Sequence, residues 1–217
     1  MPTNELFSHL DEWYSLTEMP AGKRKIFSAA LTLFSEKGFS KVGTKEIAQQ
    51  AGVSQSTLFK HFHTKEELLQ QILDPLIANI LPDYEKNFAA SLPEKMTKEN
   101  LESFIYAALE ERFTFLLNNQ EAVKILLVEL STNDHIKQQM LAEFNKQKKH
   151  FMLQVWQIFA PFKGPHSQLN AASFMRFILS QLLGYFYLTV QLCPEHKFNY
   201  EKDLREIAKE LYQIITA

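Results

Sequence analysis

Apolar side chains recur along this chain with the three- and four-residue spacing of an α-helix. The first complete stripe is Ile26, Ala29, Ala30, Leu33 and Phe34, at positions i, i+3, i+4, i+7 and i+8. Alternating patterns typical of β-strands are scarce. The spacing therefore predicts an all-α protein. Further helices are predicted at about 98–118, 120–132, 134–160, 168–192 and 200–216, with an early helix at 4–16 that docks or frays.

Two short helices are predicted on either side of the segment Ala51-Gly52-Val53-Ser54. Thr44 and Ser54 are the expected N-caps, because a side-chain oxygen there accepts an otherwise unpaired backbone N–H. Gly52 supplies the left-handed turn residue. This arrangement is a helix-turn-helix, which presents its second helix to the DNA major groove. The apolar side chains expected to face inward are Ile47, Ala48, Ala51, Leu58 and Phe62.

Glycine, proline and capping residues predict where the other helices begin and end. Gly38 is expected to stop the first helix, and Thr64 to Glu67 is typical of a capping box that opens the fourth. Pro75 and Pro82 are predicted kinks or breaks. A loop is expected at residues 162–165.

Charge is distributed unevenly along the 217 residues, whose formal net charge is −2. Residues 1–20 carry −4, residues 21–70 carry +4 and residues 71–217 carry −2. A basic segment within a mildly acidic chain indicates a nucleic-acid-facing module joined to another kind of module. The predicted helix-turn-helix lies inside this basic segment.

The second short helix leaves four side chains facing outward if Leu58 and Phe62 are buried. Glutamine can pair with adenine through two hydrogen bonds, serine with several base edges, and lysine with guanine or phosphate. The outward positions are Gln55, Ser56, Phe59 and Lys60, of which the glutamine, the serine and the lysine carry this chemistry.

Residues 44–69, TKEIAQQAGVSQSTLFKHFHTKEELL, together with 26–39, resemble the N-terminal DNA-binding domain of the TetR family of bacterial regulators. The resemblance implies a three-helix helix-turn-helix domain at 21–67, after an extension at 1–20. It also implies a helical-bundle domain at 68–217 for ligand sensing and dimerisation. The implied partners are double-stranded DNA, a second copy of the chain and a small-molecule effector.

The resemblance also implies which residues meet DNA. Thr44 and Lys65 would contact phosphates, and Gln55, Ser56 and Thr57 would approach bases or backbone. Phe59 stands where the family usually has tyrosine, so a hydroxyl that commonly reaches a phosphate is absent. The complete set of predicted DNA-binding residues is Thr44, Lys45, Ser54, Gln55, Ser56, Thr57, Phe59, Lys60, His61 and Lys65.

Arg112 falls near the centre of an apolar arc on the predicted helix 98–118. A charge at such a position must be paired or line a polar cavity. Two interpretations follow: a structural pair with Glu129, or a contact with a ligand. The predicted ligand-binding residues are Arg112, Phe113, Glu129, Phe151 and Tyr185.

Small residues on the helix 168–192 would let another helix approach closely at Ser180 and Gly184. The resemblance implies that this helix and the one at 200–216 form a homodimer interface. Packing within one subunit is the competing explanation.

Composition argues against other classes of protein. The one cysteine, Cys193, excludes an intramolecular disulfide and a thiolate-clustered metal site, and no glycine-rich phosphate loop is present. His61 and His63 lie two residues apart and do not share a helix face, so we predict no metal and no cofactor. No secretory signal or bilayer-spanning run is recognised, which predicts a cytoplasmic protein without membrane contact.

The sequence therefore predicts a homodimeric repressor of a pseudo-palindromic operator, relieved by a small apolar or amphipathic ligand. One alternative is a DNA-binding scaffold that acts through a protein partner. A helical enzyme is the rival from another class, and the chain lacks a recognisable nucleophile–base or metal spacing for it.

Overall fold

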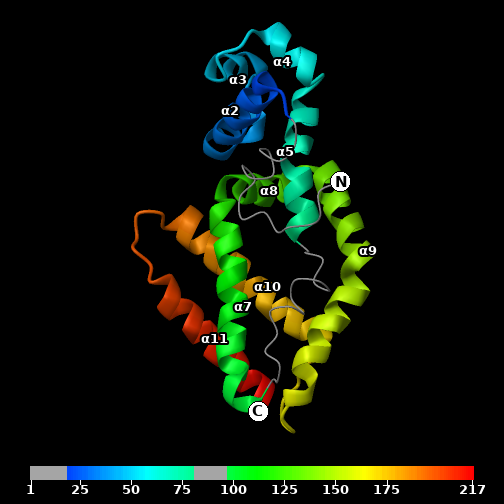
Figure 1. Ribbon diagram of the computed structural model, residues 1–217, viewed down its shortest axis with the longest axis vertical. Helices are drawn as coiled ribbons and strands as arrows, with labels where there is room; N and C mark the ends of the chain where they lie inside the picture. The colour runs from blue at the N-terminus through cyan, green and yellow to red at the C-terminus, as the bar shows by residue number, and fades with distance from the viewer. Residues whose placement is uncertain (1–18, 81–96) are drawn as a thin grey trace. The chain divides into compact units, whose positions relative to one another are not determined.

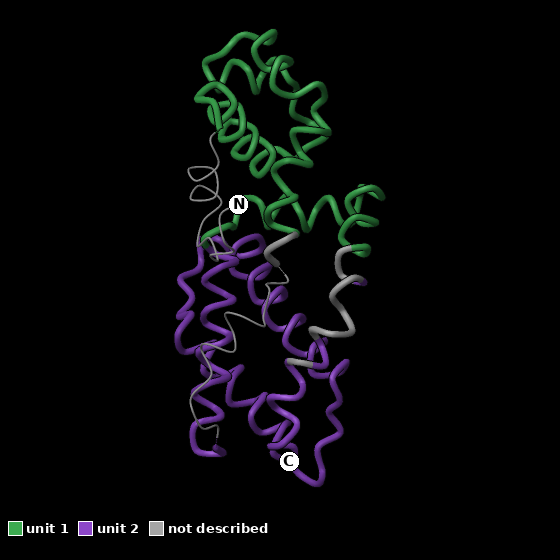
Figure 2. Tube along the Cα trace, turned by 45° about the vertical axis from the view of Figure 1, so that its right-hand side comes forward, with its two compact units in different colours: residues 1–82, 118–144 green, residues 83–117, 145–217 purple. Residues whose placement is uncertain are grey.

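The computed structural model describes residues 19–80 and 97–217, and within these ranges it contains helices and loops but no strand. The predicted all-α fold is confirmed. The predicted helix at 4–16 and the break at Pro82 lie outside the described residues. The chain divides into two compact units, residues 1–82 with 118–144 and residues 83–117 with 145–217 (Figure 2). The domain limits predicted at 67 and 68 stay a prediction.

The first unit holds the predicted helix-turn-helix. In chain order its elements are α2 (Ala21–Lys37), the 3-10 turn η1 (Phe39–Lys41), α3 (Thr44–Gln50), α4 (Gln55–His61), α5 (Lys65–Ile80), α8 (Gln120–Thr132) and the beginning of α9 (Asp134–Phe159) (Figure 1). α2 packs against α3, α4, α5 and α8. The bounds of α8 and α9 agree with the predicted ranges.

The core of the first unit is built from the stripe that the sequence predicted on α2. Ile26, Leu33 and Phe34 are almost completely buried, as is Phe27, whose ring lies 6.3 Å from that of Phe62. Gly38 ends α2 with a φ of 82°, a left-handed conformation that residues with a Cβ rarely adopt. Burial of apolar surface thus holds α2 at the centre of this unit.

One prediction about a helix end in this unit is wrong, and another is wrong in part. Thr44 is the first residue of α3 rather than its N-cap, which is Gly43 in an extended conformation without a side-chain cap. Pro75 does not break α5, which continues to Ile80, and a kink at Pro75 stays a prediction. Leu73, Leu76 and Ile77 are buried around the proline, and their burial offsets the loss of one backbone hydrogen bond.

The second unit contains α7 (Lys98–Asn118), the later part of α9, η2 (Ala160–Phe162), α10 (Ala171–Phe186), η3 (Tyr187–Leu192) and α11 (Tyr200–Thr216). α7 and α11 match their predicted ranges. The single helix predicted at 168–192 is wrong in two respects. It begins at Ala171, where Asn170 and Ser173 form a capping box, and its last six residues form a π-helix.

Thr189 lies in the π-helical turn and bonds back to the preceding helix. Its buried hydroxyl donates to the carbonyl oxygens of Tyr185 at 2.9 Å and Phe186 at 3.2 Å. Such side-chain bonds compete with the regular backbone ladder, and π turns arise where the ladder is interrupted. Thr189 therefore accompanies the change from α to π geometry.

Aromatic rings fill the second unit. Phe159 lies 6.0 Å from Phe104 and 4.7 Å from Phe174, ring centre to ring centre, and Trp156 lies 5.6 Å from Phe174. The predicted loop after η2 closes over the last turn of α11, where the Gly164 N–H donates to the carbonyl of Ile215 at 2.9 Å. A Cβ at Gly164 would lie 2.2 Å from a carbonyl oxygen, so this loop requires glycine. Among the helices of residues 19–80 and 97–217, none is long and apolar enough to cross a membrane.

Candidate functional site

Ser54 fixes the beginning of α4. Its extended backbone precedes the helix, and its hydroxyl oxygen accepts the N–H of Thr57 at 3.1 Å. The same oxygen lies 2.7 Å from the hydroxyl of Ser56 and 2.8 Å from that of Thr57. The predicted N-cap is confirmed. The first turn of α4 is therefore held by a local network before any partner arrives.

α4 has a buried face and an exposed face, as its sequence predicted. Leu58 is fully buried, as is Phe62 directly after the helix. The exposed positions are Gln55, Ser56, Phe59 and Lys60. Phe59 has 44% of its surface exposed, so an apolar ring lies among the polar side chains of this face.

α3 carries Thr44, which is half-buried, and Lys45, which is exposed. Glu46 pairs with Lys37 at the end of α2, with 2.6 Å between Nζ and Oε1. The hydrogen bond that Lys37 donates to Glu46 lowers the pKa of Glu46, and the same bond raises the pKa of Lys37. This pair ties the start of α3 to α2.

The ammonium group of Lys65 forms hydrogen bonds within the protein. Nζ donates to the carbonyl oxygens of Phe39 at 3.0 Å and Val42 at 3.1 Å, and it lies 4.1 Å from the centre of the Phe39 ring. Two of the three donors of the ammonium are therefore occupied. The phosphate contact implied by the resemblance stays a prediction. The structure adds a second role for Lys65, because its two hydrogen bonds hold the segment before α3 in place. Sequence spacing gives no signal for this role, since the acceptors are backbone atoms.

The start of α5 departs slightly from the predicted capping box. The hydroxyl of Thr64 accepts the N–H of Glu67 at 3.0 Å, as expected, but the Glu67 carboxylate accepts the N–H of His63 at 2.8 Å. His61 is half-buried at the end of α4, and its Nε2 would lie 3.4 Å from a Cβ built on Gly22 at the start of α2. No cluster of three or more metal-ligating side chains occurs among the described residues.

The predicted ligand-binding residues divide between the two units. Phe113 of α7 and Tyr185 of α10 lie in the second unit with their rings 5.1 Å apart, and the Tyr185 hydroxyl donates to Asp203 of α11. Burial, followed by the bond to Asp203, raises the pKa of Tyr185. Phe151 lies on α9, and its side chain is outside the described part. Glu129 lies on α8 of the first unit, buried, and accepts the side-chain amide of Asn133 at 3.0 Å.

Arg112 also lies in the second unit, with 16% of its side chain exposed and an ion pair to Glu111. Its Nε and Nη1 atoms are buried without a hydrogen-bond partner among the described residues. Arg112 and Glu129 thus each have a polar partner within their own unit. The predicted pairing between them stays a prediction.

The α10–α11 part of the second unit exposes several large apolar side chains. Ser180 and Gly184 are exposed on α10, and a Cβ added at Gly184 would meet no atom within 4 Å among the described residues. The exposed large apolar residues of these elements are Leu183, Tyr187, Leu188, Leu192, Tyr200 and Ile214. In the described residues, Gly184 is not required by close packing within the subunit.

Comparison with known proteins agrees with this geometry. Residues 26–72, which run from α2 into α5, match the family described as "Bacterial regulatory proteins, tetR family". The repressor KstR2 of Rhodococcus jostii is 29% identical over 112 residues, 51% of this chain and 55% of that protein. The transcriptional activator FasR of Mycolicibacterium smegmatis is 25% identical over 126 residues, 57% of this chain and 52% of that protein.

The chain spans about half the length of these curated relatives. A solved structure of the fatty acid degradation regulator FadR from Bacillus halodurans superposes with a TM-score of 0.65. That match covers 93% of this chain and 97% of the other at 15% identity, which establishes similarity of fold. The predicted resemblance is confirmed: residues 26–72 match the tetR family of bacterial regulatory proteins, and the helical fold is shared with the solved structure of FadR.

Proposed function

We propose that this protein is a homodimeric transcriptional regulator that represses genes by binding a pseudo-palindromic operator. The observation that carries the proposal is the exposed face of α4, where Gln55, Ser56 and Lys60 project beside a capped first turn. A short helix that presents polar side chains from its N-terminal turns is the reading element of a helix-turn-helix. Among the relatives, KstR2 is a transcriptional repressor and favours repression here, whereas FasR is an activator.

Dimerisation is proposed through α10, η3 and α11. The exposed apolar side chains of these elements would lose contact with water in a two-fold interface, and exposed apolar surface of this kind marks association sites. Two linked α4 helices would then bind two half-sites, which raises affinity well above that of one helix alone.

The proposed effector is a small apolar or amphipathic molecule. The aromatic interior of the second unit suits an apolar body, and FadR, with the same fold, is a fatty acid degradation regulator. We propose that the effector prefers a conformation of the dimer in which the two α4 helices do not match the spacing of the half-sites. Effector binding then weakens operator binding, and operator binding weakens effector binding by the same coupling energy, typically about 1–3 kcal/mol. We propose a cytoplasmic location for such a regulator.

Selection of binding sites from random double-stranded DNA tests the proposal. The wild-type protein is expected to enrich a pseudo-palindrome whose half-sites lie about one helical turn, or a multiple of it, apart. The double variant Gln55→Ala/Lys60→Ala serves as control because it removes two exposed side chains and leaves the Ser54 cap intact. Failure of the wild-type protein to enrich any motif contradicts the proposal.

A further inference from the structure

Arg112 occupies an apolar face of α7. Its neighbours one turn away on the same helix, Leu109 and Leu116, are 3% and 8% exposed. Only 16% of the arginine side chain is exposed. The Phe115 ring also faces the guanidinium, with 5.9 Å between its centre and Cζ. The positive charge therefore lies between apolar groups and the Glu111 carboxylate, largely shielded from water.

The hydrogen bonds of Arg112 are incomplete. Nη2 donates to Glu111, whereas Nε and Nη1 are buried and have no acceptor among the described residues. A buried donor without a partner costs about 1–3 kcal/mol, and more when it is charged. Arginine cannot avoid that cost by losing its proton. An oxygen acceptor from outside the protein would satisfy these donors once the side chains that bury them move aside.

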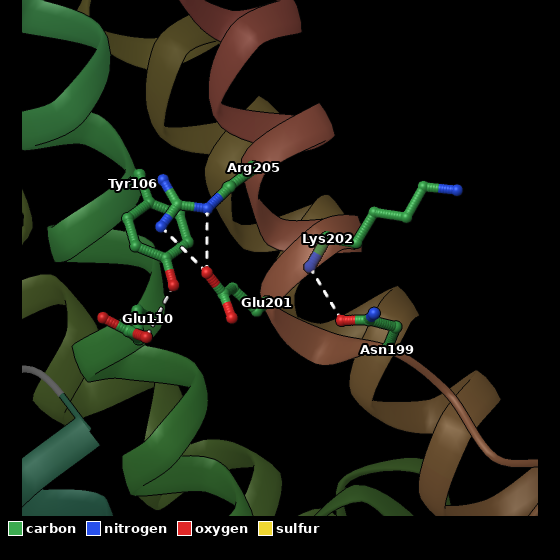
Figure 3. Close-up of polar contacts among 6 residues, drawn as sticks. All are labelled: Tyr106, Glu110, Asn199, Glu201, Lys202 and Arg205. Atoms are coloured by element: carbon green, nitrogen blue, oxygen red, sulfur yellow. Dashed lines mark hydrogen bonds and ion pairs between the residues drawn. The ribbon is translucent and has the colours of Figure 1, made fainter.

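Arg205, in the same unit, is an arginine whose guanidinium donors have hydrogen-bond partners. Its Nε and Nη2 both donate to Glu201, at 3.2 Å and 3.0 Å, and its Cζ lies 4.1 Å from the centre of the Tyr106 ring (Figure 3). Its side chain is 58% exposed, so water can reach its remaining donors. The unsatisfied donors of Arg112 are therefore not a general property of the arginines in this unit.

We propose that Arg112 anchors the carboxylate of an effector that has a single carboxylate group and an apolar body. This inference rests on the proposed sensing function and names the class of molecule sensed. A carboxylate supplies planar oxygen acceptors that match the guanidinium, and the half-buried Phe115 ring beside Arg112 is an apolar neighbour for the rest of the molecule. Glu111 already places one negative charge beside Arg112, which favours a monoanion over a phosphate or a dicarboxylate.

Straight-chain monocarboxylates from octanoate to hexadecanoate are suitable probes, each compared with the primary alcohol of equal chain length. Isothermal titration of the full chain measures both. The wild-type protein binds at least one acid of the series at least tenfold more tightly than its alcohol. Equal affinity for acid and alcohol, or binding of no acid in the series, overturns the inference.

Two arginine variants test the anchor itself. Arg112→Met keeps the length of the apolar stem and removes every donor, so the affinity for the acid falls about ten- to hundredfold, as expected for a charge-assisted hydrogen bond. Arg205→Met is the matched control and leaves that affinity unchanged, because Arg205 has its own partner in Glu201. An acid affinity that is equal in the wild type and in Arg112→Met contradicts the assignment.

A measurement on the wild type covers the case in which Arg112→Met does not fold. In protein labelled with ¹⁵N at arginine, the Nε–H resonance of Arg112 shifts when the acid is added, and that of Arg205 does not. Absence of a shift at Arg112 contradicts the inference. DNA binding of the same preparation, measured without acid, separates the two proposals. If the protein binds DNA but the Arg112 resonance does not respond to the acid, only the carboxylate anchor is rejected. If the protein binds the acid but does not bind DNA, the proposed regulator is rejected.

Discussion

The ammonium group of Lys65 donates a hydrogen bond to the carbonyl oxygen of Val42 at 3.1 Å, across 23 positions of the sequence. Val42 is buried and lies two residues before α3, while Lys65 is the first residue of α5. A second bond reaches Phe39. Lys65 therefore joins the first turn of α5 to the segment that positions Thr44 and Lys45 at the start of α3.

Salt dependence separates this positioning role from a phosphate contact. Lys65→Met is expected to weaken DNA binding without changing the slope of log K against log salt concentration, because its ammonium is already bonded to carbonyls. Lys60→Met is the control, since Lys60 is exposed on α4 and its loss should reduce the slope by about 0.9 for one lost phosphate contact. Fluorescence anisotropy over a salt series measures both slopes.

An equal reduction of slope in Lys65→Met and Lys60→Met would show that Lys65 leaves its carbonyls and binds a phosphate, as the sequence resemblance implies. Lys65→Arg provides a further check. It keeps the charge but replaces the compact ammonium with a planar group, so a positioning role predicts incomplete rescue.

Ser54→Ala is expected to destabilise the protein by about 0.5–2 kcal/mol, because the N–H of Thr57 loses its capping acceptor. Urea unfolding followed by circular dichroism gives the change in free energy. Ser56→Ala is the matched control, since its hydroxyl bonds only to Ser54 in this network and caps no backbone group there. The cap assignment fails if the two variants are equally stable.

Glu46 is expected to titrate below the usual range of a glutamate, since the bond from Lys37 lowers its pKa. A carboxylate with a lowered pKa stabilises the folded state above its unfolded pKa, and this contribution is lost as pH falls through the folded value. Lys37→Met should return the pKa of Glu46 toward its ordinary value. Side-chain NMR titration of both proteins measures it, and an unchanged pKa in the variant contradicts the pairing.

Periodicity and turn chemistry predicted most of the helices correctly, because these helices are specified by residues close together in the sequence. The ends of α7, α8 and α11 follow from residues close in sequence, as does the cap at Ser54, so local patterns contain the information. The break predicted at Pro75 does not occur, because tertiary burial of its neighbours outweighs its local preference.

The candidate site was less predictable where it depends on distant groups. The bonds of Lys65 end on backbone carbonyls, which carry no residue-type signal. Whether the donors of Arg112 find acceptors depends on residues distant in sequence. A helical wheel shows only that Arg112 lies on an otherwise apolar face. The exposed face of α4, in contrast, follows from spacing alone, and the structure confirms it.

Gly184→Leu is expected to convert the proposed dimer to monomers and to weaken operator binding sharply. A Cβ at position 184 meets nothing within 4 Å in the described subunit, so we expect the leucine side chain to extend toward the proposed partner, where overpacking costs about 1–3 kcal/mol per site. Gly184→Ala is the control and should remain dimeric. Sedimentation velocity and DNA binding report on both variants, and a Gly184→Leu protein that stays dimeric places the interface elsewhere.

The central claim is that the exposed face of α4 reads DNA sequence, and the most direct measurement is a ratio of affinities. The wild-type protein is titrated at physiological salt onto its selected site and onto a scrambled duplex of equal length and composition. We predict a preference of about a thousandfold or more for the selected site, reduced in Gln55→Ala by about 1–3 kcal/mol at one base pair per half-site. Equal affinity of the wild type for both duplexes would contradict the account.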